Sequence, residues 1–215
     1  MSDPQPRPEP IFKAPWPALL ASAAVIVPHI LLQRVDDATI QSLALVPHAF
    51  WEGRWTGAIT MMFVHANWIH AIMNAAFALA FGAPVARLLG LNGRGGGIFC
   101  LFYLACGALS SVGYAAIHPD SMGVVVGASG AISGLMGAAA RTMDYRGGVG
   151  PILGPRVISL GLGWLVVNLV MAVVGGFPGM GGAVAWEAHL IGFAVGVLLI
   201  GPFARWAGPP AEREA

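Results

Sequence analysis

Two polar residues with complementary chemistry lie in apolar stretches of this chain. Ser129 stands in the tetrapeptide Gly-Ala-Ser-Gly, and His189 is the histidine of the last apolar stretch. A serine hydroxyl is a weak nucleophile until a neighbouring base takes its proton, and histidine is the usual base because its pKa lies near neutral pH. Polar and ionisable groups inside membrane segments are costly, which makes both residues functional candidates. The pair predicts nucleophilic catalysis by a Ser129–His189 dyad.

Each residue also has a structural interpretation, since serine often packs as a small residue between membrane helices and histidine can hydrogen-bond across them. The surrounding residues favour chemistry. Ser129 is expected to open a helix, where free backbone N–H groups and the positive end of the helix dipole would face a developing oxyanion. A GxxxG sequence follows each candidate, at 130–134 and at 192–196. Small residues at this spacing let two helices cross closely, which would bring Ser129 and His189 together.

His70 and Asn74 form a second candidate group. They are four residues apart and therefore about 40° apart around a helix. Asn74 can donate two N–H bonds and a neutral His70 can donate one. Together with backbone N–H groups near Ser129, they are predicted to form an oxyanion hole, which typically contributes several kcal/mol. His65, five residues before His70, should face elsewhere, and a structural role tying the outer loop to the second span is expected for it.

No carboxylate is placed to complete a triad with His189. Glu187 precedes it by two residues, so on a helix it points away from the same face. The dyad is therefore expected to work without an acid. A zinc protease motif needs two histidines at positions i and i+4 with a glutamate beside the first. Because His65 and His70 are five apart and no intramembrane carboxylate lies nearby, neither a metal nor another cofactor is expected.

The composition places these residues in a membrane protein. Of the 215 residues, 57% are hydrophobic and 10% are charged, against about 25% charged in a typical soluble domain. The 30 glycines are spread through apolar runs, as in membrane helices that pack closely. Cys100 and Cys106 point to opposite sides of a helix, so they cannot bridge each other. A net charge of +1 gives no indication of nucleic-acid binding.

Six apolar stretches near membrane-spanning length are expected to form helices. They cover residues 17–33, 60–89, 97–117, 125–142, 156–175 and 184–206, and the second is long enough to include an interfacial turn. The predicted fold is an all-α polytopic membrane protein, with a tail at 1–16, a six-span domain at 17–206 and a tail at 207–215. The connections on the side of both tails hold nine lysines and arginines, and the other side holds two. By the positive-inside rule both tails are cytoplasmic.

This topology tests the candidate site independently of any motif. Spans two, four and six all enter from the outer face, and the four candidate residues lie near the outer ends of these spans. They can therefore sit at similar depth, within about two helical turns of one another. The outer connection at 34–59 carries Phe50, Trp51 and Trp55, which favour the headgroup zone. This connection can be an interfacial anchor or take a direct part in catalysis.

With these motifs in order, the chain resembles the rhomboid family of intramembrane serine proteases. The resemblance covers roughly residues 15–206 and rests on His65-x4-His70-x3-Asn74, Gly127-Ala128-Ser129-Gly130 and Ala188-His189-x2-Gly192-x3-Gly196. It implies a six-transmembrane-helix rhomboid bundle that hydrolyses peptide bonds in or near transmembrane segments of single-span or polytopic membrane proteins. The lipid bilayer expected is a bacterial inner (plasma) membrane. The resemblance also implies that His70, Asn74 and the Ser129 N–H hold the oxyanion.

Two positions depart from the family pattern. Thr56 follows Trp55 where many relatives have Trp-Arg, and Ser133 stands where an aromatic ring often stacks on the catalytic histidine. The loss of a stacking ring is expected to leave His189 less firmly oriented. This departure bears on the catalytic efficiency of the protein more than on its resemblance to the family.

Two alternatives are a catalytically inactive rhomboid-like protein, which binds membrane proteins or assists their quality control, and a small transporter. Inactive relatives usually lack the serine or the histidine, and this chain keeps both. Transporters often show internal repeats and a site at the membrane midplane. Here no convincing repeat is found, and the polar residues gather toward the outer end instead.

Overall fold

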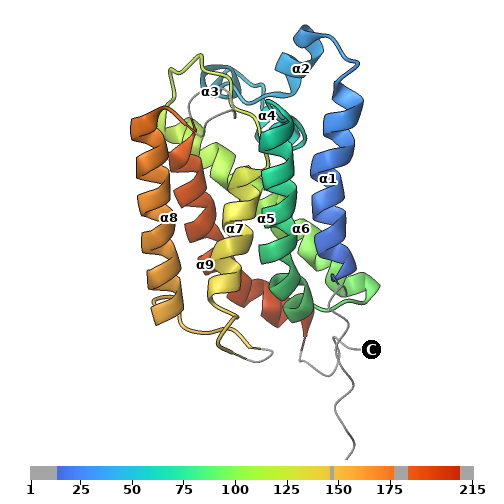
Figure 1. Cartoon of the computed structure of the whole chain (residues 1–215), viewed down its shortest axis with the longest axis vertical. Coiled ribbons are helices and arrows are strands. Elements are labelled where there is room, and N and C mark those ends of the chain that lie inside the picture. The colour runs from blue at the N-terminus through green and yellow to red at the C-terminus, as the bar shows by residue number, and fades with distance from the viewer. Residues whose placement is uncertain (1–13, 146–147, 177–183, 209–215) are drawn as a thin grey trace, which may run out of the picture.

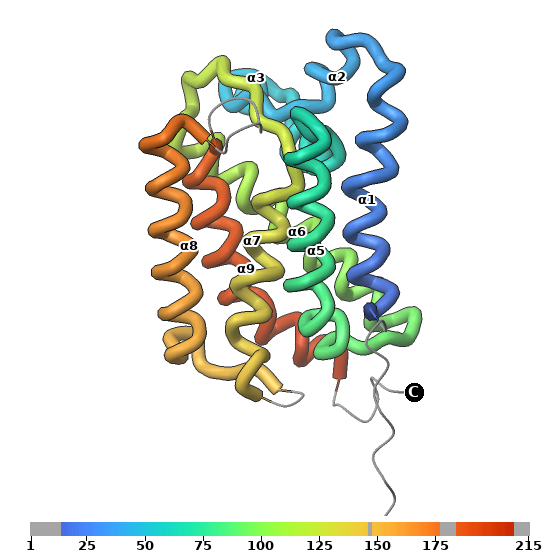
Figure 2. The backbone as a smooth tube through the Cα atoms, in the orientation of Figure 1, coloured from blue at the N-terminus to red at the C-terminus, as the bar shows by residue number. Residues whose placement is uncertain are grey.

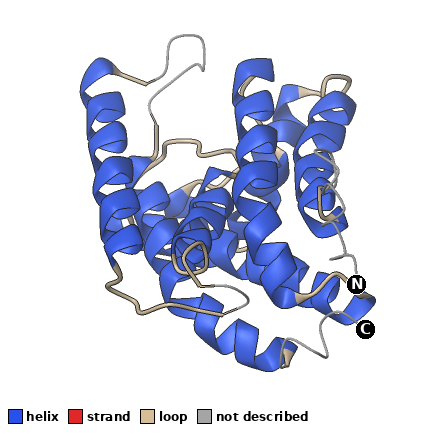
Figure 3. Cartoon of the chain, turned by 60° about the horizontal axis from the view of Figure 1, so that its bottom comes forward, coloured by secondary structure: helices blue, strands red, loops and turns tan. Residues whose placement is uncertain are grey.

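The computed structural model of this chain describes residues 14–145, 148–176 and 184–208, and within them the long elements are all helices (Figures 1 and 3). Four helices are long and apolar enough to cross a membrane: α5 (Trp68–Leu89), α6 (Gly93–Ile117), α8 (Pro155–Val174) and α9 (Trp186–Ala207). Two shorter apolar helices, α1 (Trp16–Leu32) and α7 (Ser129–Ala140), complete the bundle. The prediction of an all-helical integral membrane protein is confirmed. Most of the two predicted tails lies outside the described residues.

The connection predicted at 34–59 folds into short helices at one end of the bundle. These are α2 (Asp37–Leu43), α3 (Pro47–Trp51) and α4 (Gly57–Thr60), followed by the 3-10 turn η1 (Met61–Phe63). The second span, predicted from residue 60, begins as a continuous helix at Trp68. Asn67 sets that start, because its backbone is extended and its side chain accepts a hydrogen bond from the His70 N–H at 2.9 Å. The expected interfacial turn is thus at the N-terminal side of this span.

The α7 helix is shorter than the predicted stretch 125–142. Its 12 residues rise about 18 Å, which is less than the roughly 30 Å of a bilayer core. The chain before it descends into the bundle in a non-helical segment, as Figure 2 shows. Hydropathy could not reveal this, because an apolar extended segment and an apolar helix have the same composition. Every residue of α7 after Ser129 is buried, so this helix lies at the centre of the fold.

Backbone contact between glycines fixes how α7 and α9 cross. A side-chain carbon at Gly192 would run into the carbonyl oxygen of Gly130, and one at Gly196 would run into the carbonyl of Gly134. The predicted close crossing of the two GxxxG sequences is therefore confirmed. Glycine is needed here for space, because a neighbouring backbone cannot rotate away as a flexible side chain can. Cys106 packs against α7 at Gly134, and Cys106 and Cys100 are both free thiols.

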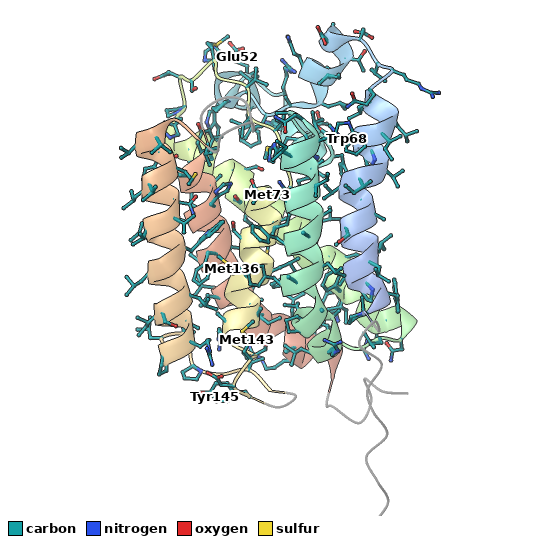
Figure 4. The ribbon with its side chains drawn as sticks, in the orientation of Figure 1. Glu52, Trp68, Met73, Met136, Met143 and Tyr145 are labelled. Atoms are coloured by element: carbon teal, nitrogen blue, oxygen red, sulfur yellow. The ribbon has the colours of Figure 1, made fainter. Side chains whose placement is uncertain are left out.

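The two ends of the bundle differ in charge. Arg94, Arg141 and Arg156 lie at the end opposite α2 and α3, where the α5–α6 and α7–α8 connections and the end of α9 meet (Figure 1). There Arg94 donates to the Trp206 carbonyl at 2.9 Å. Figure 4 marks the same end by Tyr145 and the α2–α3 end by Glu52, with Met73 and Met136 between them. Four of the predicted basic positions, Arg7, Lys13, Arg146 and Arg213, lie outside the described residues.

Candidate active site

Ser129 and His189 meet near the α2–α3 end of the bundle. The Nε2 atom of His189 lies 2.7 Å from the Oγ atom of Ser129, which is hydrogen-bond distance. Ser129 is the first residue of α7, and His189 lies in the first turn of α9. Both side chains are partly exposed, although the residues around them are largely buried. The sequence-based expectation that these two residues come together is met by the geometry.

Gly127 sets the direction in which the chain enters α7. Its φ angle is +117°, a conformation that L side chains rarely adopt. A side-chain carbon there would also lie 2.8 Å from the ring of His70, so the position needs glycine for space as well. The backbone then turns through Ala128 into the helix at Ser129. Because Ser129 is the first residue of α7, its N–H belongs to the groups at the helix start that have no partner within the helix.

Contacts from earlier segments hold the loop that precedes Ser129. Gly127 donates its N–H to the Met61 carbonyl at 2.9 Å, and Ala128 donates to Nε2 of His65 at 3.4 Å. Further out, Leu45 and Val125 form an isolated β-bridge with backbone bonds of 3.0 and 2.8 Å. His65 therefore has a structural contact with the segment that precedes Ser129, and its expected tie to the outer connection stays a prediction.

The α5 helix places His70 beside this loop, and Asn74 lies one turn deeper. The imidazole of His70 faces Gly127, as the close approach described above requires. Asn74 is buried, and its Nδ2 donates to the His70 carbonyl at 2.9 Å. Its Oδ1 has no hydrogen-bond partner among the described residues. The geometry brings His70 next to the candidate nucleophile, and the oxyanion role of both residues stays a prediction.

Asn168 is the site residue that sequence reasoning missed. Its Oδ1 lies 2.7 Å from Nδ1 of His189, on the opposite side of the ring from Ser129. Asn168 is 2% exposed on α8, where it lies between apolar neighbours, Val167 and Leu169. A single amide within the apolar stretch 156–175 was the available signal. It was overlooked because the search for a partner of His189 considered only carboxylates.

An aromatic ring lies next to His189, although it does not come from α7. Trp164 of α8 has its ring centroid 5.7 Å from that of His189, with an angle of 31° between the planes. Ser133, where a stacking ring was expected to be lost, instead donates its Oγ to the Ser129 carbonyl at 2.8 Å. Position 133 thus supplies no ring to His189, as expected, and a different helix supplies an aromatic neighbour.

The acidic residue nearest to His189 in sequence has another partner. Glu187 lies 3.0 Å from Nε2 of His118, which follows the end of α6. The prediction that Glu187 points away from His189 is confirmed. Within the described residues, no group of three histidine, cysteine, aspartate or glutamate side chains is arranged to hold a metal ion.

At the other departure from the family pattern, Thr56 precedes α4 and its carbonyl accepts the Thr60 N–H at 2.9 Å.

Comparison with known proteins gives two matches. The model of the rhomboid domain family matches residues 52–206. The chain is also 30% identical over 147 residues to a Bacillus subtilis (strain 168) protein named "Putative rhomboid protease YdcA". That match covers 68% of this chain and 66% of the relative's length. Residues 52–206, matched by the family model, include His65, His70, Asn74, Ser129, Asn168 and His189.

Proposed function

This chain belongs to the rhomboid family, and we propose that it is an intramembrane serine protease acting through a Ser129–His189 dyad. The observation that carries the proposal is the 2.7 Å contact between Nε2 of His189 and Oγ of Ser129. A hydroxyl and an imidazole held at this distance by two packed helices can act as a nucleophile and its base. The alternative, an inactive relative that only binds membrane proteins, has no need of this pairing.

In the proposed reaction, Ser129 Oγ attacks the carbonyl carbon of the scissile peptide bond while His189 Nε2 takes the hydroxyl proton. The tetrahedral intermediate collapses, the C–N bond breaks, and the proton on Nε2 passes to the leaving amine. The acyl group remains on Ser129 as an ester. A water molecule then gives its proton to His189 and attacks the ester, which releases the second product and restores both side chains.

The oxyanion of the intermediate is assigned to the N-terminal side of α7. The Ser129 N–H would donate to it as the first amide of α7, and the positive end of the helix dipole would add to this stabilisation. His70 supports this assignment because its ring lies against Gly127, two residues before the nucleophile. Asn74 would contribute its amide after leaving the His70 carbonyl, which its Nδ2 contacts at 2.9 Å. One such donor typically contributes about 2.7–4 kcal/mol to the transition state.

The substrate class follows from where the dyad lies. Ser129 and His189 are on helices buried in an apolar bundle, so the peptide bond must reach them in or near the membrane. An intact helix hides its peptide bonds in backbone hydrogen bonding, so the substrate segment must be extended or unwound where it is cut. Single-span or polytopic membrane proteins fit this requirement. We place the protein in the bacterial inner membrane with both termini cytoplasmic, the orientation that the basic residues favour.

The test uses purified protein in liposomes with a fluorogenic single-span substrate. Wild type is expected to cleave it, and Ser129→Ala is expected to show no cleavage with unchanged thermal unfolding. A serine-reactive fluorophosphonate is applied to the same samples and should label wild type at Ser129 only. Absence of both cleavage and labelling in folded wild-type protein would reject the protease and favour the inactive relative.

A further inference from the structure

We infer that Asn168 is a positioning residue for His189, so that the site is a Ser–His–Asn triad assembled from three helices. This inference rests on the proposed function. The Ser129 and His189 side chains come from α7 and α9, and Asn168 comes from α8. Its amide oxygen lies 2.7 Å from Nδ1 of His189, while Nε2 of the same ring lies 2.7 Å from Ser129 Oγ.

A backbone carbonyl determines which way the Asn168 amide points. Its Nδ2 lies 2.8 Å from the carbonyl oxygen of Trp164, one turn earlier on α8. A carbonyl oxygen can only accept, so the group facing it must be the NH₂ and not the amide oxygen. The reverse orientation would bring two oxygens together and leave the NH₂ facing His189. The helix therefore turns Oδ1 toward Nδ1 of His189.

The orientation of the amide in turn fixes the tautomer of His189. Because Oδ1 is an acceptor, Nδ1 must carry the hydrogen, and a neutral imidazole has only one N–H. Nε2 is then left with its lone pair, which accepts the Ser129 hydroxyl. When His189 takes the serine proton, Nδ1–H continues to donate to Asn168. The same contact thus selects the reactive tautomer beforehand and holds the ring during proton transfer.

The placement of Asn168 is hard to explain without His189. Val157 and Asn168 are the two buried residues of α8, and Asn168 is 2% exposed. A buried amide that lacks partners costs about 1–3 kcal/mol, so an apolar residue would suit the α8–α9 contact better if packing were its purpose. Trp164, from the same face of α8, covers the ring of His189 at a centroid distance of 5.7 Å. Both contacts of the imidazole with α8 therefore serve its orientation.

The direct test is a tautomer measurement by NMR on detergent-solubilised protein labelled with ¹⁵N-histidine, using His189→Gln to assign the signal. In wild type the neutral His189 ring is expected with its hydrogen on Nδ1. In Asn168→Leu, which keeps bulk but removes the acceptor, a mixture of both tautomers is expected. A wild-type ring with hydrogen on Nε2, or an unchanged spectrum in Asn168→Leu, would overturn the inference. This readout needs no substrate, so it remains decisive if the protease proposal fails.

Kinetics then separate positioning from packing. Asn168→Leu should lower kcat by about tenfold to a hundredfold with little change in KM, as expected when a general base loses orientation. Asn168→Asp keeps an acceptor and should recover part of the rate. Its carboxylate would stabilise the imidazolium, so the acid limb of the pH–rate profile should move to higher pH. Leu169→Ala, which is 43% exposed on α8, is the control and should behave as wild type. Equal losses in the Leu and Asp variants, matched by equal losses of thermal stability, would reduce Asn168 to a packing residue and overturn the inference.

Discussion

The α7 and α8 helices both contact α9 at His189, yet they are held in very different ways. Every residue of α7 after Ser129 is buried, and its glycine carbonyls touch the glycines of α9 directly. On α8, most side chains face outward, and Asn168 and Trp164 are the residues that reach the ring of His189. Backbone packing therefore sets how closely the helices of Ser129 and His189 approach each other. A polar contact from the less buried helix α8 meets the ring of His189 from the other side.

This comparison separates two kinds of failure. A change in the α7–α9 crossing should alter the distance between the reacting atoms and destabilise the bundle at the same time. A change on α8 should leave α7 and α9 in place. It should reduce the fraction of molecules in which the His189 ring is aligned with Ser129.

The largest effect is expected for His189→Ala, which removes the ring that both Ser129 of α7 and Asn168 of α8 contact. Cleavage in liposomes should fall to the uncatalysed background, because no base remains to activate Ser129. Thermal unfolding should change little, since the site is partly exposed and the glycine crossing is untouched. Residual cleavage well above background would mean that another group activates the serine.

Gly192→Val should disrupt the close crossing of α7 and α9. The new side chain would run into the Gly130 carbonyl, and a backbone cannot yield without shifting a helix. Overpacking of this kind typically lowers the free energy of unfolding by about 1–3 kcal/mol. Because the helix is displaced, the variant should also lose most of its cleavage activity. The matched control is Gly163→Val on α8, where a side-chain carbon meets nothing within 4 Å. The two variants are compared by thermal unfolding and by cleavage rate, and equal behaviour would contradict the packing account.

Asn74→Ala removes a candidate transition-state contact that comes from α5 and leaves the residues of α7 and α8 unchanged. Turnover is expected to fall by roughly tenfold to a thousandfold while KM changes little, as for other oxyanion-hole donors. This variant separates oxyanion stabilisation from the orientation of His189, because it should lower turnover while the His189 tautomer stays unchanged. Steady-state kinetics in detergent measure the effect. Unchanged turnover would remove Asn74 from the oxyanion role.

The smallest effect is expected for Trp164→Leu. The ring covers one face of His189, and aromatic contacts of this kind contribute about 0.5–1.5 kcal/mol beyond burial. The Trp164 carbonyl belongs to the backbone and stays in place, so Asn168 should keep its orientation. We therefore expect kcat to fall by roughly twofold to tenfold, with the NMR spectrum of His189 showing the wild-type tautomer. A loss as large as that of Asn168→Leu would make the ring, and not the amide, the main support.

The sequence alone was sufficient to predict that Ser129 and His189 lie together and that the glycines beside them let their helices cross closely. Serine and histidine stand out against an apolar background, and glycine at a spacing of four has a direct meaning for helix contact. The start of α5 could also be predicted from sequence, because an asparagine such as Asn67 is a recognised helix cap. The length of α7 could not be predicted, since hydropathy is the same for a helix and for the extended segment before Ser129.

What only the tertiary structure decided is the environment of the imidazole. A sequence names the side chains in an apolar stretch, but the face they present depends on how the helices are rotated and tilted against each other. Asn168 and His189 are 21 residues apart on different helices, and their contact exists only because α8 is turned to place one amide against α9. The same rotation brings Trp164 to the ring, in the role expected of position 133. Composition and spacing thus determined the membrane class and the candidate pair Ser129 and His189, while helix packing determined which side chains surround the His189 ring.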